Sequence, residues 1–207
     1  MSKIWTFGDS FCYDGGWTVY YSLWKGYKPK IHTEIIAEEL DIENINLSYP
    51  GYSNDMIFDV ICENIKKIKS DDIINIGWVP IERFRLATDD GKWGRILPLF
   101  SKKEIESDGR LDNISKTTID EIFANRTNPI YKKELHNRIE LINYSLPNNK
   151  IIHWSWVKMN TFETITKETN GEIRDEHWSE RGQLDFSKWF INKVQNNNHY
   201  NDLTNIL

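Results

Sequence analysis

Short apolar runs alternate with longer amphipathic segments along most of the chain, a pattern typical of strands alternating with helices. The run Ile4–Phe7 is largely apolar, and Ile73–Gly77 is dominated by isoleucine. Continuous runs of this kind are typical of central strands covered by helices on both faces. Between them, His32–Leu40 repeats apolar residues at helical intervals, and Ile45–Leu47 follows as another short strand. This strand, helix, strand order predicts parallel strands joined by crossover helices.

The alternation continues to the C-terminal part of the chain. Ser53 or Asn54 is suited to cap a helix before the isoleucine-rich strand. Farther along, the pattern predicts a helix over Tyr131–Leu146, a strand over Lys150–Trp156, a closing helix over Leu184–Val194 and a frayed tail from Gln195. The fold class predicted is therefore α/β: a three-layer α/β/α sandwich around a mainly parallel, flavodoxin-like sheet of four or five strands.

The pattern weakens between residues 85 and 129, where charged residues and turn residues separate short apolar pieces. We interpret this stretch as an insertion in a single domain that covers residues 1–207. A connection this long without clear secondary structure is usually functional or mobile. Two interpretations follow: a lid over a functional site, or solvated helical decoration.

Composition limits the class of protein and its partners. At 207 residues with 39% hydrophobic residues, the chain suits one globular domain with a full core. The formal net charge of -5 would repel phosphate backbones, and no stripe of Lys and Arg with interleaved aromatic residues occurs. We therefore expect no nucleic-acid partner, whereas the sequence does not indicate an oligomeric state.

The chain carries no visible targeting or membrane segment. It enters the first strand at once, and no apolar run approaches the roughly 18 residues that a membrane span needs. Cys12 and Cys62 are its two cysteines, too few for a disulfide framework. We expect a cytoplasmic protein that does not bind membranes. No spacing of His, Cys or carboxylates suggests a metal site, and no phosphate-binding loop occurs, so no cofactor is expected.

Candidate chemistry begins where the first strand ends. Gly8-Asp9-Ser10 would deliver a hydroxyl to the rim of the sheet, where the reactive groups of open α/β folds collect. A plain turn that Gly and Asp favour would explain the same residues. A serine hydroxyl needs a base, and the base needs an orienting partner. His177 and Asp175 could supply both, because residues two apart in an extended segment point the same way.

Three segments together resemble the SGNH (GDSL-type) hydrolases: Ile4–Phe11, Asn46–Asp55 and Asp175–Gly182. In that family the first block carries the nucleophilic serine, and the second carries a glycine whose N–H helps to hold the oxyanion. The family has four such blocks in all. Its third block, which none of these segments matches, supplies an asparagine, and its fourth supplies an Asp and a His. The resemblance spans nearly the whole chain and implies a catalytic triad of Ser10, Asp175 and His177, with oxyanion donors from the backbone of Ser10 and Gly51.

The sequence departs from the family's third block. The asparagine is expected two residues after a glycine that ends the third strand, and Val79 stands at that position after Gly77. The donor could come from Asn54 or Trp78 instead, the hole could have only two donors, or the protein could lack hydrolase activity. We assign Asn54 to the oxyanion hole as the third donor.

The last block departs as well, because one residue separates Asp175 from His177 where the family usually has two. Arg174 occupies the position at which the acid is expected. Glu172, Glu176 or a backbone carbonyl could therefore orient His177 in place of Asp175, and a carbonyl would leave a Ser–His dyad.

The sequence as a whole predicts a serine esterase. We expect it to remove a small acyl group, most plausibly acetyl, from a polar carrier such as a carbohydrate, through an acyl-enzyme on Ser10. The residues expected to bind this small-molecule ester are Asp9, Trp17, Trp78, Arg83 and Trp178. Indole rings commonly stack on sugars, although simple packing would also explain the tryptophans. The alternative is a catalytically impaired, hydrolase-like module that binds a ligand or supports an assembly.

Overall fold

The computed structural model describes residues 2–13, 18–80, 84–87, 93–96, 129–156, 161–196 and 199–201. Side chains are not described at residues 18, 84–87 and 93–96. The insertion predicted at 85–129 therefore lies mostly outside the described residues. Its described part includes β4 (Phe84–Ala87) and β5 (Trp93–Ile96), which pair as an antiparallel hairpin where the sequence pattern predicts no regular structure.

The centre of the fold is a five-stranded sheet in the order β2-β1-β3-β6-β7. Its strands are β1 (Lys3–Phe7), β2 (Glu43–Asn46), β3 (Ile73–Trp78), β6 (Lys150–Ser155) and β7 (His199–Asn201). Every pairing within it is parallel. Counted within the sheet, the order is 2-1-3-4-5, which is that of flavodoxin. The predicted α/β class and strand order are confirmed.

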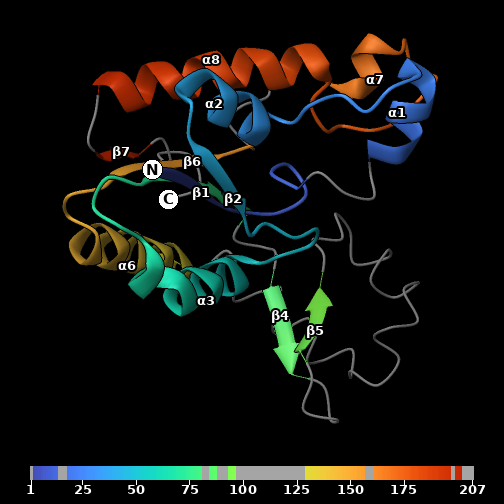
Figure 1. Cartoon of the computed structure of the whole chain (residues 1–207). Helices are drawn as coiled ribbons and strands as arrows, with labels where there is room; N and C mark the ends of the chain where they lie inside the picture. Colours follow the sequence, from blue (N-terminus) through green and yellow to red (C-terminus); the bar gives the residue numbers. More distant parts are fainter. Residues whose placement is uncertain are drawn as a thin grey trace, which may run out of the picture.

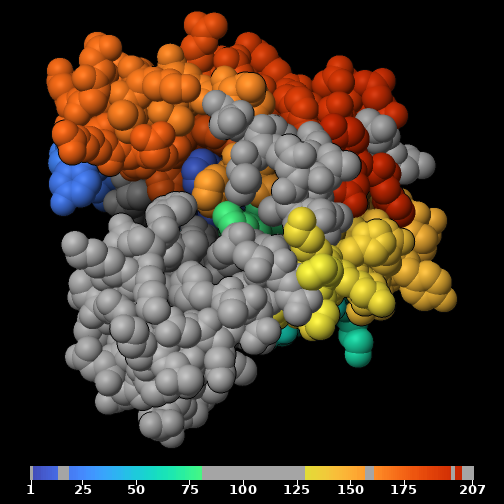
Figure 2. Space-filling view, turned by 180° about the vertical axis from the view of Figure 1, so that it is seen from behind, coloured from blue at the N-terminus to red at the C-terminus, as the bar shows by residue number. Residues whose placement is uncertain are grey.

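Helices cover the sheet on both faces, which confirms the three layers (Figure 1). One face carries α2 (His32–Leu40) and α8 (Glu180–Asn196). The other carries α3 (Asn54–Asn64), continued by a 3-10 turn at Ile65–Lys67, and α6 (Pro129–Ser145). Figure 2 shows the molecule from behind, with α8 in red above and α6 in yellow below it. Ser53 caps α3, because its Oγ accepts the N–H of Met56.

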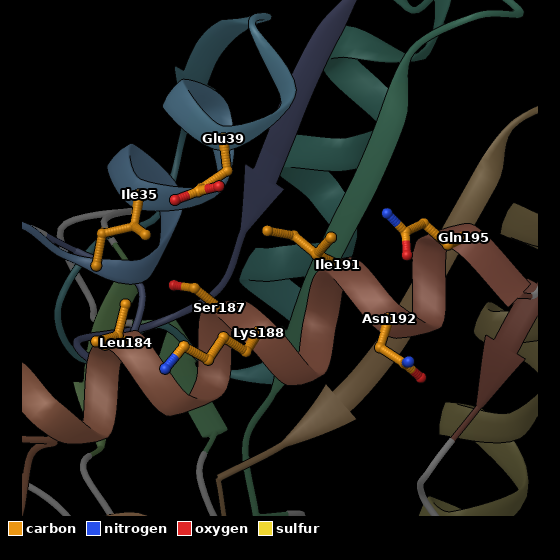
Figure 3. Close-up of a pocket in the computed structure, with 8 residues that line it drawn as sticks. All are labelled: Ile35, Glu39, Leu184, Ser187, Lys188, Ile191, Asn192 and Gln195. Atoms are coloured by element: carbon orange, nitrogen blue, oxygen red, sulfur yellow. The ribbon is translucent and has the colours of Figure 1, made fainter.

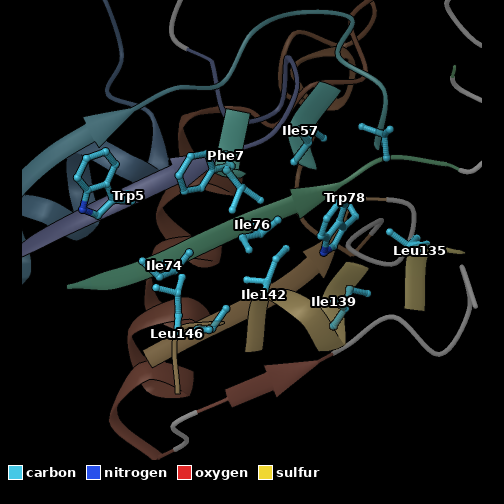
Figure 4. Close-up of a cluster of buried hydrophobic side chains, with 13 residues drawn as sticks. Trp5, Phe7, Ile57, Ile74, Ile76, Trp78, Leu135, Ile139, Ile142 and Leu146 are labelled. Atoms are coloured by element: carbon cyan, nitrogen blue, oxygen red, sulfur yellow. The ribbon is translucent and has the colours of Figure 1, made fainter. Parts of the chain in front are cut away.

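The two cores differ in character. Between the sheet and α3 and α6, buried isoleucines from the strands pack against aliphatic side chains of the helices (Figure 4). The core beneath α2 and α8 is aromatic, with Trp154, Trp178 and Phe186 in mutual contact and ring centroids 4.6–5.4 Å apart. The segment that contains His177 is thus anchored through its neighbour Trp178 in the aromatic core.

Besides the β4–β5 hairpin, three regular elements have no counterpart in the sequence prediction. They are α1 (Thr18–Lys25), α7 (Ile165–Glu168) and β7. The prediction of a frayed tail is wrong for β7, which pairs with β6 at the edge of the sheet. Its central residue, Tyr200, contacts the Trp189 ring at 5.7 Å and lies beneath the ammonium group of Lys193 at 4.2 Å. A three-residue strand with polar residues on both sides gives no periodicity, so tertiary contacts alone define it.

Two histidines are completely buried in the cores and held neutral. Burial, with a smaller effect of His199, lowers the pKa of His153 to about 3. Its Nδ1 accepts the indole N–H of Trp78 at 3.1 Å, and its Nε2 donates to Asn143 at 3.0 Å. Burial likewise lowers the pKa of His32 to about 4, although the Gln183 side chain bonded to its Nδ1 opposes the shift.

These histidines predict that stability falls on mild acidification. The unfolded chain binds protons at both imidazoles below about pH 6.5, whereas the folded chain excludes them until about pH 4 and pH 3, so stability is lost as pH falls through this window. At pH 5 each histidine should cost about 2 kcal/mol relative to pH 7. Urea unfolding of wild type and His153→Gln at both pH values checks this, and an unchanged pH dependence in the variant would contradict it.

The loop that leaves β1 packs closely against the end of β3 through two glycines and Cys12. A Cβ at Gly8 would lie 2.6 Å from the Cys12 Sγ, and one at Gly77 would lie 3.0 Å from the same sulfur and 2.8 Å from the Trp154 ring. Cys12 is completely buried and fills the space that these glycines leave. The absence of side chains at Gly8 and Gly77 therefore sets how closely the two strand ends approach.

Gly8→Ala should destabilise the protein by about 1–3 kcal/mol through overpacking against Cys12. Cys12→Ala removes the sulfur, so the double variant should recover part of that loss. Chemical denaturation of the four proteins gives the coupling energy between the two positions, which we expect to exceed about 0.5 kcal/mol. Additive losses would show that Gly8 and Cys12 do not constrain each other.

Candidate active site

Ser10 lies in a tight turn at the carboxyl end of β1. The carbonyl of Asp9 accepts the N–H of Cys12 at 3.0 Å, and the Asp9 carboxylate accepts the N–H of Phe11 at 3.1 Å. Asp9 is only 1% exposed, so its side chain serves the turn. Ser10, between these anchors, keeps part of its surface accessible. The turn thus presents a partly exposed hydroxyl at the edge of the sheet.

The structure brings Ser10, His177 and Asp175 together. His177 Nε2 lies 2.8 Å from Ser10 Oγ, and its Nδ1 lies 2.5 Å from Asp175 Oδ1. The same carboxylate oxygen accepts the backbone N–H of His177 at 2.9 Å. Residues from the two ends of the chain therefore form one continuous chain of hydrogen bonds.

The segment that carries Asp175 and His177 is fixed against α7 by the backbone. Ile165 donates its N–H to the carbonyl of His177 at 2.9 Å. Thr166 donates its N–H and its hydroxyl to the carbonyl of Asp175, both at 2.9 Å, and its Oγ1 accepts the Asp175 N–H at 2.8 Å. These bonds fix the positions of Asp175 and His177 relative to α7.

The charge state of Asp175 decides which nitrogen of His177 carries a proton. Burial acts to raise the pKa of the Asp175 carboxyl, but hydrogen bonds from the ring and backbone N–H of His177 outweigh it and lower the pKa below its usual range. An ionised carboxylate can only accept hydrogen bonds, so Nδ1 carries the proton. Nε2 then offers its lone pair to the hydroxyl of Ser10, the orientation that a general base needs.

Aromatic rings hold the imidazole in this orientation. Phe11, next to Ser10, lies with its ring centroid 4.6 Å from that of His177. The Trp156 ring stacks on the Phe11 ring with centroids 4.8 Å apart. The Trp178 ring makes a T-shaped contact with the Phe11 ring, with centroids 5.4 Å apart. The ring of His177 is therefore restrained by packing as well as by its hydrogen bonds.

The geometry distinguishes among the acids that could orient His177. Asp175 contacts the ring, whereas Glu172 and Glu176 are exposed. Glu172 accepts the indole N–H of Trp24 at 3.0 Å and so faces α1. The short Asp–His spacing is accommodated because the carboxylate bonds both the ring and the backbone N–H of His177.

Gly51 occupies a turn beside the Ser10 loop. Tyr52 donates its N–H to the carbonyl of Tyr49 at 3.2 Å, and Gly51 has a φ of 80°, which glycine adopts without strain. The Tyr49 N–H donates to the carbonyl of Gly8 at 3.2 Å. The turn with Gly51 is thereby tied to the loop with Ser10, as a shared oxyanion site would require.

The expected third donors have other partners. Asn54 is 6% exposed, and its side-chain amide accepts the N–H of Val79 and donates to its carbonyl, both at 2.9 Å. Trp78 is completely buried and donates its indole N–H to His153. The assignment of Asn54 to the oxyanion hole is therefore not supported. In the described part of the chain, the backbone N–H groups of Ser10 and Gly51 remain the candidate donors.

Most of the expected substrate-binding residues are buried. Trp78 is 0% exposed, Trp178 is 2% exposed, and Asp9 holds the Ser10 turn, so none of these three side chains is placed to contact a substrate. Trp17 and Arg83 lie outside the described residues. Sequence reasoning missed tyrosines that border Ser10 and Gly51, of which Tyr49 is exposed. Tyr49 and Tyr52 lie within the segment Asn46–Asp55 that carries the resemblance, which was the available signal.

A groove between α2 and α8 lies on the outer layer of the fold (Figure 3). Ile35 and Glu39 line one side, and α8 side chains including Leu184 and Lys188 line the other. It contains none of the predicted site residues.

No group of His, Cys, Asp and Glu in the described ranges could hold a metal ion. Within the same ranges, no helix combines the length and apolar character needed to cross a membrane.

Comparison with known proteins gives likenesses to solved structures alone. The chain matches no protein-family model and no curated protein at a significant level. Among solved structures it is similar to the lipase/acylhydrolase from Enterococcus faecalis, with 17% sequence identity, a TM-score of 0.39, and coverage of 95% of this chain and 96% of that chain. A likeness at this level does not identify a family or an activity, so any assignment of function rests on the side chains themselves.

Proposed function

We propose that the protein is a serine hydrolase of carboxylic esters, with Ser10 as nucleophile, His177 as general base and Asp175 as the orienting acid. The observation that carries the proposal is the bonded series Asp175–His177–Ser10, with distances of 2.5 and 2.8 Å. A hydroxyl, an imidazole with its lone pair toward that hydroxyl, and an ionised carboxylate behind the ring are the parts that acyl transfer to serine needs.

Acylation would proceed as follows. Ser10 Oγ attacks the ester carbonyl carbon while its proton passes to His177 Nε2, and Asp175 stabilises the imidazolium that forms. The tetrahedral intermediate collapses by breaking the bond to the leaving alcohol, which takes the proton from Nε2. The acyl group remains on Ser10.

Deacylation would use the same groups in the same order. Water attacks the acyl-enzyme, gives its proton to His177 Nε2, and the intermediate releases the carboxylic acid as Ser10 regains its proton. The backbone N–H groups of Ser10 and Gly51 would stabilise the negative oxygen in both steps. Each missing donor costs about 100-fold or more in rate, so a two-donor hole predicts a slow enzyme that still turns over.

The substrate we propose is a small acyl ester, in particular an acetyl ester, on a polar carrier such as a carbohydrate. The site supports a polar carrier because it is bordered by partly exposed tyrosines, whereas its tryptophans are buried.

We also propose that residues 1–207 act as one cytoplasmic domain. The two cysteines are unpaired, one buried and one exposed, as suits a reducing compartment.

A second candidate function is a hydrolase-like binding module without turnover. The observation that favours it is Val79 at the position of the third donor, with its backbone bonded to Asn54. Such a module would keep the hydrogen bonds among Ser10, His177 and Asp175 as structural contacts. The two functions differ in whether Ser10 supports hydrolysis.

Hydrolysis of p-nitrophenyl acetate by wild type and Ser10→Ala tests the proposal. We expect wild type to release nitrophenolate at least about 1000-fold faster than the variant, because the variant lacks the nucleophile. Circular dichroism of both proteins controls for folding. Equal rates from two folded proteins would remove the serine hydrolase and favour the binding module.

Asp175→Asn tests the orienting acid. An amide cannot stabilise the imidazolium and can favour the wrong tautomer, so we expect kcat to fall by about 100-fold or more with little change in KM. Glu176→Gln, one residue away and exposed, is the matched control and should retain wild-type kinetics. If Glu176→Gln lost activity while Asp175→Asn retained it, the assignment of the acid would be reversed.

A further inference from the structure

Three tyrosines form a continuous row beside the candidate active site. The Tyr49 ring lies between the other two, with its centroid 5.6 Å from that of Tyr13 and 5.5 Å from that of Tyr52. The planes are tilted by 45° and 32°, so neighbouring rings meet at an angle. We call Tyr13, Tyr49 and Tyr52 the tyrosine row.

The loops that carry the tyrosine row also carry Ser10 and Gly51. Tyr13 lies three residues after Ser10, while Tyr49 and Tyr52 flank the turn of Gly51. The bond from the Tyr49 N–H to the carbonyl of Gly8 joins the two loops at 3.2 Å. On the other side, the Asn46 amide donates to the carbonyl of Cys12 at 2.7 Å. The row therefore keeps a fixed relation to the nucleophile and to the Gly51 N–H.

The tyrosine row differs from the buried aromatic residues in its exposure. Tyr49 keeps 43% of its surface exposed, and Tyr13 and Tyr52 are partly exposed. The tryptophans around His177, by contrast, pack into the core or onto Phe11. The row is thus the aromatic surface next to Ser10 that the described residues offer to solvent.

The chemistry of the tyrosine row selects one class of ligand. Each tyrosine offers an apolar ring and a hydroxyl at its tip. A pyranose matches this combination, since it has an apolar face of C–H groups and hydroxyls around its edge. The rings offer no formal charge to pair with an anionic carrier, and the net charge of the chain is -5. A neutral sugar therefore fits better than a phosphorylated one.

We propose that the tyrosine row is the carrier subsite, which stacks against the pyranose ring of a neutral O-acetylated sugar and places its ester at Ser10. This inference rests on the proposed serine hydrolase function. It replaces the buried tryptophans expected from the sequence with residues that are at least partly exposed and anchored to both catalytic loops. Tyr49, in the middle of the row, makes the largest contact.

The test compares two acetate esters that differ in their carrier: an O-acetylated methyl glucoside and ethyl acetate, which has no ring to stack. Acid release is followed in a pH-stat. Tyr49→Ala should lower the ratio of kcat/KM for the sugar ester over that for ethyl acetate by about 5- to 10-fold, mainly through KM. Tyr49→Phe, which keeps the ring, should restore most of the ratio.

Tyr144→Ala is the matched control, because Tyr144 is 84% exposed on α6 and belongs to neither catalytic loop. It should leave the ratio at the wild-type value. If Tyr49→Ala also leaves the ratio unchanged while hydrolysis still depends on Ser10, the tyrosine row is not the carrier subsite and the serine hydrolase stands.

A binding measurement separates the two proposals if neither ester is hydrolysed. Calorimetry of the O-acetylated methyl glucoside with Ser10→Ala should give binding that Tyr49→Ala weakens by about 5- to 10-fold in the same background. Such a result would support the tyrosine row although the hydrolase had failed. Absence of binding would overturn the proposal. Tighter binding of tetramethylammonium than of the sugar would also overturn it, because aromatic rings attract such cations.

Discussion

The candidate active site depends on the hydrogen bond between Ser10 Oγ and His177 Nε2. This bond joins residues 167 positions apart in the chain, at a distance of 2.8 Å. Neither partner is held by local structure alone. Ser10 needs the end of β1, and His177 needs a segment fixed by α7 and by Trp178 in the aromatic core. The sheet order places both at one edge, where parallel strands of open α/β folds present their ligands.

Close packing at the strand ends makes this convergence possible. Gly8 and Gly77 leave room for the Cys12 sulfur, so the loops after β1 and β3 approach more closely than side chains would allow. The Tyr49 N–H then joins the Gly51 turn to Gly8. Nucleophile, candidate oxyanion donor and tyrosine row are therefore all linked to the backbone at Gly8. In consequence, a small backbone shift at Gly8 would disturb all three together.

Much of the fold is predictable because isoleucine-rich runs mark buried strands and helical spacing marks the crossovers. The strand Ile73–Trp78 and the helix His32–Leu40 are found almost where the periodicity places them. The strand His199–Asn201 is not predictable, because it is held by one ladder and by contacts of Tyr200 with α8. The proximity of Ser10 and His177 was also expected, because their segments resemble the first and last blocks of the SGNH hydrolases. Their catalytic role is a proposal.

Side-chain direction limited the prediction of the site. Composition could not tell that Trp78 and Trp178 point into the cores, because an aromatic residue at a strand end serves either packing or binding. Asn54 was expected to donate to the oxyanion hole, yet its amide bonds both backbone groups of Val79 and so extends the pairing past the end of β3. That role depends on a contact across 25 residues and leaves no local signal.

The central claim is that His177, oriented by Asp175, makes Ser10 a nucleophile. Covalent labelling by a fluorophosphonate, located by peptide mass spectrometry, tests it most directly because no substrate need be known. The account predicts one adduct, on Ser10, formed at least about 100-fold more slowly in folded His177→Gln. No adduct on Ser10, or labelling at an equal rate in the variant, would contradict it.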